Sequence, residues 1–366
     1  MPRAGATDST VNVHDARQLS LRKPRAGRLI FAFALLLCFA AAPLCAALPQ
    51  RATIIVDTDA GSDDLMAIAF LLARTDAPIE AITVANGLAH VGPGANNILR
   101  LLELAGRRSI PVYMGREKPL RGDAEFPQEW RTVSDELPGV QLPATTRKPE
   151  TRSAAEFLVA RLRDTRRPVR ILALGPLTNL GEALRRDYSL ARNIREIVIM
   201  GGAVHVPGNL NDGGYLKTDN ITAEWNLYVD PLAARLVFSS GARIRLVPLD
   251  ATNRVPIDLK FLEELERRAA TPLGRFVAQV LETGRKYIEQ GIYCAWDPLA
   301  AAALVEPAVV KTQRLTIEVR LSPPEAGRTA QVTGKPPNAT VALDAAPALF
   351  RAAFLRALGY TPATRR

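Results

Sequence analysis

Residues 54–72 read IIVDTDAGSDDLMAIAFLL and decide the fold that we expect for this chain. The stretch opens with β-branched apolar residues, as buried strands do, and closes with apolar residues typical of a buried helix. Between these segments, four carboxylates fall within eight residues, those of Asp57, Asp59, Asp63 and Asp64. Like charges crowded beside a nonpolar core repel one another and lose hydration, so they need a cation or a shared proton. The stretch therefore predicts a functional site where a strand gives way to a helix.

Short β-rich segments alternate with helical segments along the chain, which is typical of a parallel sheet with crossover helices. We expect an α/β fold, an open and mostly parallel sheet covered by helices on both faces, with a Rossmann-like core, in a single domain over residues 51–366. Ligands of such sheets bind at the carboxyl ends of the strands, where the four carboxylates lie. The expected strands are 53–57, 79–85, 112–114, 169–174, 194–200 and 243–248, and the expected helices include 64–74 and 95–105.

Two segments have no clear hydrophobic period. Residues 119–149, rich in Pro, Gly and charge, predict a long excursion over the surface, and loops of this length are often lids. Residues 205–222, rich in Gly and Asn, predict a second irregular stretch. Towards the C-terminus we expect two helices within 258–290, strands at 315–321, 329–332 and 339–343, and a closing helix at 345–358.

Residues 1–50 have the order of charge and hydrophobicity of a signal peptide. A basic stretch precedes the apolar run 29–48, which ends in small residues. We therefore expect export to the periplasm or the extracellular space, with membrane contact only through this leader. An uncleaved membrane anchor and lipid attachment at Cys45 are the alternatives. Only Cys294 lies beyond the leader, which excludes an internal disulfide and a thiolate metal cluster in the mature domain.

The composition is that of a globular protein and does not indicate nucleic-acid binding. The chain has 366 residues, of which 48% are hydrophobic, and a formal net charge of +10. Six Lys or Arg and two Asp fall within residues 1–50, so +6 remains for the rest of the chain. The cations of the domain are scattered and form no basic stripe interleaved with aromatic residues. We therefore expect a small-molecule substrate and no nucleic-acid partner.

The acidic cluster also indicates which cation it would bind. An N-cap and a first-turn acid of the helix would account for one or two of the four carboxylates, but not for all of them. Carboxylate oxygens are hard ligands that suit Ca²⁺ or Mg²⁺, and the lack of nearby His and Cys argues against zinc. We therefore expect a bound divalent cation.

Residues 57–64, DTDAGSDD, resemble the Asp-x-Asp-Pro-Gly-x-Asp-Asp signature of the calcium-dependent nucleoside hydrolases, with Ala60 in place of the usual Pro. The resemblance extends from Thr53 to the final helix. It implies Ca²⁺-dependent hydrolysis of the N-glycosidic bond of ribonucleosides, which gives free base and ribose. Four further motifs follow in the family's order, LGPLTNL at 174–180, VIMGG at 198–202, AEWNLYVDP at 223–231 and WDP at 296–298.

Carried over by position, the resemblance implies a role for each matching residue. Asp59 is the expected catalytic base, which takes the proton from the attacking water after the ion has increased the acidity of that water. Polar and acidic groups around the sugar stabilise its oxocarbenium-like transition state. The expected Ca²⁺ ligands are Asp59, Asp64 in bidentate fashion, the backbone carbonyl of Thr178, and Asp297. The expected ribose contacts are Asp63, Asn220, Glu224 and Asn226, where Asn220 requires a gap in the motif.

Two departures from the family pattern concern substrate binding. Leu88 stands where many members place a ribose-binding Asn, and Asn86 either takes over that contact through a shifted loop or leaves it absent. Trp296 stands where non-specific members carry a His that protonates the leaving base, which Trp cannot do. Purine-preferring members have a Trp beside this Asp, and stacking on a purine favours its protonated form. We therefore expect purine ribonucleosides, with Trp296 in contact with the base; the alternative is a Trp of the core.

Other functions and partners remain open from the sequence. A haloacid-dehalogenase-like phosphatase also has a strand that ends in Asp-x-Asp, but it needs a later Lys and a separate acidic pair, which do not stand in order here. An exported, non-catalytic nucleoside- or sugar-binding protein that has kept the pocket is a second alternative. His90 and His205 lie in expected loops and are candidates for the leaving-group acid. We also expect a homo-oligomer.

Overall fold

The computed structural model describes residues 52–360 except 165 and 168. This part of the chain contains an 8-stranded sheet in the order β3-β2-β1-β4-β5-β6-β10-β7. Neighbouring strands are parallel except β10 and β7, which pair antiparallel at one edge. The expected α/β fold is therefore confirmed. The strands are β1 (Thr53–Thr58), β2 (Ile79–Val84), β3 (Val112–Met114), β4 (Val169–Ala173), β5 (Ile194–Met200), β6 (Ile244–Val247), β7 (Val310–Leu315) and β10 (Ala339–Ala345).

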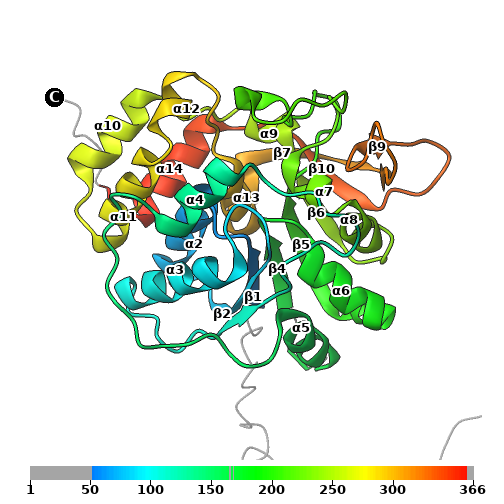
Figure 1. The fold of residues 1–366 in the computed structure, drawn as a ribbon, viewed down its shortest axis with the longest axis horizontal. Helices are drawn as coiled ribbons and strands as arrows, with labels where there is room; N and C mark the ends of the chain where they lie inside the picture. The colour runs from blue at the N-terminus through cyan, green and yellow to red at the C-terminus, as the bar shows by residue number, and fades with distance from the viewer. Residues whose placement is uncertain (1–51, 165, 168, 361–366) are drawn as a thin grey trace, which may run out of the picture. The chain divides into compact units, whose positions relative to one another are not determined.

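Helices cover both faces of the sheet, and β1 shows why (Figure 1). Its side chains alternate between two cores, because Ile54 and Val56 belong to one hydrophobic cluster and Ile55 belongs to the other. The first cluster includes side chains of α2 (Ser62–Leu72), α3 (Val91–Leu104), α11 (Pro272–Glu282), α13 (Trp296–Val305) and α14 (Pro347–Ala357). The second includes those of α5 (Ala154–Arg163), α6 (Thr178–Arg186) and α8 (Pro231–Phe238).

The strand order creates a crevice beside β1. The chain runs from β1 outward to β2 and β3 and then returns to place β4 on the other side of β1. The connections that leave the carboxyl ends of β1 and β4 therefore diverge, and open α/β sheets bind ligands at such a point. Asp59 directly follows β1, and Thr178 follows β4 at the start of α6.

The long excursion at 119–149 contains a helix that the sequence did not predict. Helix α4 (Gln128–Glu136) is mostly polar and buries only two side chains, Arg131 and Ser134, so it has too few apolar residues to reveal it. Residues 258–290 likewise hold three helices rather than two, α10 (Leu259–Arg268), α11 and α12 (Arg285–Glu289).

The strand expected at 315–321 is divided between two sheets. Its first residue ends β7, and β8 (Ile317–Val319) pairs instead with β9 (Thr329–Gln331) in a small antiparallel sheet. The break falls at Thr316, whose hydroxyl donates to the carbonyls of Lys335 (2.9 Å) and Pro336 (3.0 Å). Shorter elements are α7 (Trp225–Val229), α9 (Leu249–Thr252), η1 (Tyr188–Asn193), η2 (Asp212–Gly214) and η3 (Pro307–Val309).

The described residues from 52 onward belong to one compact unit. Among them, no helix combines the length and the hydrophobicity needed to cross a bilayer. The predicted leader at residues 1–50 lies outside the described part of the chain.

Candidate active site

Asp64 shapes the turn between β1 and α2. Its carboxylate accepts hydrogen bonds from the backbone N–H groups of Asp59 (3.2 Å) and Gly61 (3.1 Å) and from the hydroxyl of Thr58. Ala60 has a φ of 58°, in the left-handed region that alanine rarely adopts. Strain of this kind persists only where surrounding contacts hold it, and it is concentrated at functional sites. The turn thereby places Asp59 and Asp64 together at the carboxyl end of β1.

The side chain of Asp59 is enclosed by two close backbone approaches. Its Oδ2 accepts a hydrogen bond from the N–H of Leu88 (2.7 Å). A Cβ atom on Gly87 would lie 1.9 Å from this Oδ2, and a Cβ on Gly175 would lie 2.7 Å from the Asp59 Cγ. Only glycine fits at either position without displacing the carboxylate. The turns after β2 and β4 therefore fix Asp59 from both sides.

Three carboxylates form a buried group in the crevice. Asp63 and Asp64, in the first turn of α2, and Asp297, in the first turn of α13, each offer a carboxylate oxygen within 4.8 Å of the others. Burial, followed by the charge of Asp64, raises the pKa of Asp63 and of Asp297 above their usual range. Asp297 Oδ1 is buried and has no hydrogen-bond partner.

This donor set fits a hard divalent cation. The group consists of carboxylate oxygens without His or Cys, which suits Ca²⁺ or Mg²⁺ rather than zinc. A cation there would relieve the repulsion between the acids and would give Asp297 Oδ1 a partner. Asp64 and Asp297 lie where the resemblance placed metal ligands. Asp63, which was expected to contact the ribose, belongs to the same group of acids. Asp59 is not part of this group, but its backbone N–H donates a hydrogen bond to Asp64.

Asp57, the fourth acid of the opening stretch, does not line the cavity. It accepts hydrogen bonds from the hydroxyl of Thr83 (2.6 Å) and from Nδ2 of Asn179 (2.8 Å), and burial raises its pKa to about 6. It thereby holds the start of α6, where Thr178 lies. The Thr178 hydroxyl donates to Asp230 (2.8 Å), which also caps α8.

Glu224 and Asn226, the expected ribose contacts, line the other wall of the cavity. Glu224 caps α7 and accepts hydrogen bonds from the N–H groups of Gly202 (2.9 Å) and Asn226 (2.9 Å). Burial raises the pKa of Glu224 to about 7. Asn226 Nδ2 donates to the carbonyl of Leu174 (2.6 Å), at the end of β4. Both side chains are thus fixed before a ligand binds.

Asn220 and Asn86 do not reach the cavity. Asn220 Nδ2 donates to the carbonyl of Ala326 (2.8 Å), and Asn86 Oδ1 accepts from the guanidinium of Arg131 (2.6 Å). Neither residue is among those that line the cavity, whereas Leu88 is. Neither Asn86 nor Asn220 is therefore placed at the cavity, where a ribose contact was expected.

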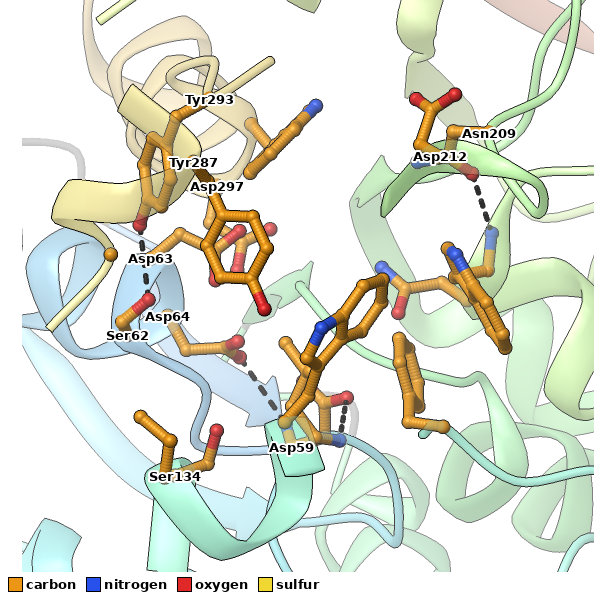
Figure 2. Close-up of a pocket in the computed structure, with 18 of the residues that line it drawn as sticks. Asp59, Ser62, Asp63, Asp64, Ser134, Asn209, Asp212, Tyr287, Tyr293 and Asp297 are labelled. Carbon is orange, nitrogen blue, oxygen red and sulfur yellow. Dashed lines mark hydrogen bonds between the residues drawn. The ribbon is translucent and has the colours of Figure 1, made fainter. Parts of the chain in front are cut away.

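Asn209 lies at the cavity instead of Asn220, and the sequence reasoning missed it. Asn209 Oδ1 accepts a hydrogen bond from the N–H of Trp225 (3.2 Å). The preceding Gly208 approaches the backbone of Ala223 so closely that a Cβ would lie 2.0 Å from its carbonyl oxygen. The sequence contained one signal for Asn209, which is the pair Gly208-Asn209. This pair lies between Gly201-Gly202, directly after β5, and Glu224. Figure 2 shows Asn209 and Asp212 across the cavity from Asp59, Asp63, Asp64 and Asp297.

Aromatic rings form another part of the cavity wall. Trp296, the expected contact of the nucleobase, lines the cavity and contacts Tyr293, with ring centroids 5.0 Å apart. Trp130, from the helix that the sequence missed, packs edge-on against Trp225 (5.5 Å) and Tyr287 (6.2 Å). Both aromatic rings and carboxylates therefore line the cavity that a planar ligand would enter.

The two loop histidines have other partners. His90 Nδ1 lies 2.6 Å from Asp135 Oδ2, and His205 Nε2 lies 2.7 Å from Gln331 Oε1. Among the described residues, no histidine lines the cavity. Neither His90 nor His205 is therefore placed to protonate a leaving base.

Residues 54–352 match the family described as inosine-uridine preferring nucleoside hydrolase. The chain belongs to this family. Nucleoside hydrolases cleave N-ribosyl bonds, so the chain is an enzyme of the predicted class, and the phosphatase alternative has no support.

The relatives of this nucleoside hydrolase are named for different substrates. The chain is 35% identical over 307 residues to a pyrimidine-specific ribonucleoside hydrolase of Citrobacter koseri, a match that covers 80% of this chain and 93% of the relative. A plant nucleoside hydrolase has a similar structure, with a TM-score of 0.74, 28% identity, and coverage of 84% of this chain and 99% of the other. A purine-preferring ribonucleoside hydrolase from Gardnerella vaginalis has a TM-score of 0.72, 26% identity, and coverage of 84% and 98%. The shared fold therefore serves enzymes named for either class of base.

Proposed function

We propose that this nucleoside hydrolase cleaves the N-glycosidic bond of ribonucleosides to free base and ribose, with Ca²⁺ as its cofactor. The observation that supports this most directly is the group formed by Asp63, Asp64 and Asp297, whose members all line the same cavity as Asp59 and Glu224. A metal-binding group, a candidate base and a polar wall thus converge on one cavity. A protein that only bound nucleosides would not need this complete set.

Asp63, Asp64 and Asp297 would hold the ion, and the carbonyl of Thr178 remains an expected ligand. When bound, Ca²⁺ would increase the acidity of a coordinated water and orient the ribose hydroxyls. Burial and the charge of Asp64 raise the pKa of Asp59 well above its usual range in the metal-free chain. A nearby cation lowers such a pKa and leaves the carboxylate able to accept a proton from water.

The other wall stabilises the sugar as positive charge develops on it. Glu224 and Asn226 are held by backbone groups, so they need not reorganise when the C–N bond lengthens. The fixed carboxylates around the cavity favour an oxocarbenium-like ring over the neutral ground state. Asn209 is added to this wall in place of Asn220.

The preference for purine bases is a separate proposal based on the aromatic wall. Trp296 and Trp130 both line the cavity, and a purine offers more surface for stacking than a pyrimidine does. The similarity to a pyrimidine-specific hydrolase of Citrobacter koseri favours pyrimidine bases instead. The ratio of kcat/KM for inosine to that for uridine decides between them. In Trp296→His we expect this ratio to fall, and an unchanged ratio would contradict stacking on Trp296.

Chromatography of the products tests the reaction itself. Purified protein with Ca²⁺ should convert inosine to hypoxanthine and ribose, or uridine to uracil and ribose. Binding of either nucleoside without release of base would support the non-catalytic alternative instead. Release of phosphate from a phosphate ester with no cleavage of nucleosides would contradict the proposal.

We also propose that the chain is exported through the leader at residues 1–50. The support is the order of a basic stretch, an apolar run and small residues in the sequence. Sequencing the N-terminus of the mature protein tests this proposal. A start after the apolar run is expected, and a mature protein that begins at Met1 would contradict cleavage.

A further inference from the structure

Three segments that are distant in the sequence meet at the rim of the cavity through four side chains, Glu129, Tyr215, Lys286 and Tyr287, which we call the rim cluster. Lys286 Nζ donates to Glu129 (2.5 Å) and to the Tyr215 hydroxyl (2.8 Å). The Tyr215 hydroxyl also donates to Glu129 (2.9 Å) and lies 3.2 Å from the Tyr287 hydroxyl. The rim cluster therefore joins α4, the loop 209–222 and α12.

Lys286 also interacts with the rings of this cluster. Its ammonium lies 5.0 Å from the ring centroid of Tyr287 and 5.5 Å from that of Tyr215. Cations are attracted to aromatic faces at this distance. The bond to Glu129 is the main reason that the pKa of Lys286 is raised, so the lysine keeps its charge at neutral pH.

Two members of the rim cluster, Tyr215 and Tyr287, contact the ring of Trp130. Trp130 contacts Tyr215 at an interplanar angle of 67°, Trp225 at 68° and Tyr287 at 85°, so each contact is edge-on. Trp130 lines the cavity, so a planar base could stack on it if the indole is held in place.

The first turn of α4, where Glu129 and Trp130 lie, depends on the rim cluster more than the rest of the helix does. Later in the helix, Arg131 is only 2% exposed and bonds to Asn86 (2.6 Å), and the carbonyl of Ser134 accepts from Asn97 (3.1 Å). Glu129 is anchored instead by an ion pair in which its side chain is 54% exposed and that of Lys286 is 51% exposed. Exposed pairs are weak, so this contact can form and break as ligands enter and leave.

We propose that Lys286 is a positioning residue that, through the rim cluster, holds Trp130 and Tyr287 against the nucleobase. This inference rests on the proposed function and adds residues to it that the sequence motifs do not contain. Loss of Lys286 should weaken substrate binding and leave the chemistry at Asp59 intact. Its signature is therefore a change in KM without a matching change in kcat.

Steady-state kinetics with inosine and uridine test the proposal. In Lys286→Met, which keeps most of the apolar stem, we expect KM to rise about three- to tenfold and kcat to stay within about twofold. Glu129→Gln should change KM in the same direction, and Lys286→Arg should restore KM towards the wild-type value. Raising the salt from about 0.05 M to about 1 M should increase the wild-type KM but not that of Lys286→Met, because salt screens exposed ion pairs.

Lys311→Met is the matched control. Lys311 forms a comparable exposed pair with Asp344 (2.8 Å), between β7 and β10, and neither residue lines the cavity. This variant should keep the wild-type KM at both salt concentrations. If the wild type is active and both Lys286→Met and Glu129→Gln have the wild-type KM, the role of Lys286 is overturned and the proposed function is not affected. A wild type that releases no base from either nucleoside would contradict the proposed function instead.

Discussion

Asp57 and Asp59 stand two residues apart but have different surroundings and different roles. Asp57 lies within β1 and bonds to Thr83 and Asn179, so its carboxylate supports the start of α6. Asp59 follows the end of β1 and faces the cavity. The end of the strand between them separates a supporting residue, Asp57, from the proposed catalytic base, Asp59.

This difference predicts distinct effects of the same substitution. Asp59→Asn removes the proposed base, so kcat should fall by about 10²- to 10⁴-fold while the protein stays folded. Asp57→Asn leaves the base in place and should act mainly by lowering the melting temperature. Ribose release and thermal unfolding, measured on both variants, check this. Wild-type kcat in Asp59→Asn would show that another group accepts the proton.

Glu224 gives a pH dependence of stability. Its pKa is raised to about 7 by burial, so the folded metal-free protein holds this proton more tightly than the unfolded chain does. The contribution of Glu224 to stability is fully present below the pKa of an unfolded Glu and is lost as the pH rises to about 7. The free energy of unfolding should therefore fall by about 3 kcal/mol through this group over that range.

Urea unfolding of the metal-free protein between about pH 4.5 and pH 7.5 measures this effect. In Glu224→Gln the decrease with pH should be smaller than in the wild type. Glu263→Gln, at an exposed position of α10, serves as the control and should follow the wild-type profile. If the free energy of unfolding falls equally with pH in Glu224→Gln and in the wild type, Glu224 is not the source of this pH dependence.

At the scale of elements, the turn after β2 determines where the side chain of Asp59, the proposed catalytic base, lies. A Cβ on Gly87 would lie 1.9 Å from Asp59 Oδ2, whereas a Cβ on Gly92, in the first turn of α3, would meet nothing within 4 Å. Gly87→Ala should therefore displace Asp59 and lower kcat by about 10²-fold. Gly92→Ala should keep kcat and stabilise the protein by up to about 1 kcal/mol. Equal kcat values for the two variants would contradict the enclosure of Asp59.

The elements that carry strong local patterns could be predicted from the sequence. The run from β1 into α2 is apolar on both sides of its acids, and it forms where the sequence placed it. Helix α4 could not be found in this way, because its residues are mostly polar and its position depends on contacts such as the one between Arg131 and Asn86. Trp130 and the rim cluster were missed for the same reason.

The positions of the acids in the candidate metal site could also be read from the sequence, whereas part of the opposite cavity wall could not. Asp64 and Asp297 stand in motifs with fixed spacing, so counting along the sequence locates them. Asn209 is separated from Glu224 by a long irregular loop, and counting back from Glu224 leads to Asn220 instead. Only the fold shows that Gly208 brings Asn209, and not Asn220, to the cavity.

At the scale of the whole molecule, the acidic group joins distant parts of the chain. Asp63 and Asp64 belong to α2, near the start of the described residues, and Asp297 belongs to α13, more than two hundred residues later. Without a cation, these buried acids repel one another across the interface between the two helices. A cation bound by this group would therefore stabilise the fold as well as the site.

This coupling predicts that Ca²⁺ raises the melting temperature. At a Ca²⁺ concentration one hundred times its Kd, the gain is about 2.7 kcal/mol. Differential scanning calorimetry of protein stripped of metal, with and without Ca²⁺, measures it. Asp297→Asn should reduce the gain, and Asp344→Asn, at the surface, should not. A melting temperature that does not respond to Ca²⁺ would contradict metal binding by this group.

The most direct test of the account is the release of ribose from inosine and uridine by metal-stripped protein before and after Ca²⁺ is restored. We predict that the stripped protein is inactive, that activity returns with saturable dependence on Ca²⁺, and that Asp64→Asn does not recover. Full activity in stripped protein held in excess chelator would contradict the central claim, that the buried acids act by holding a divalent cation.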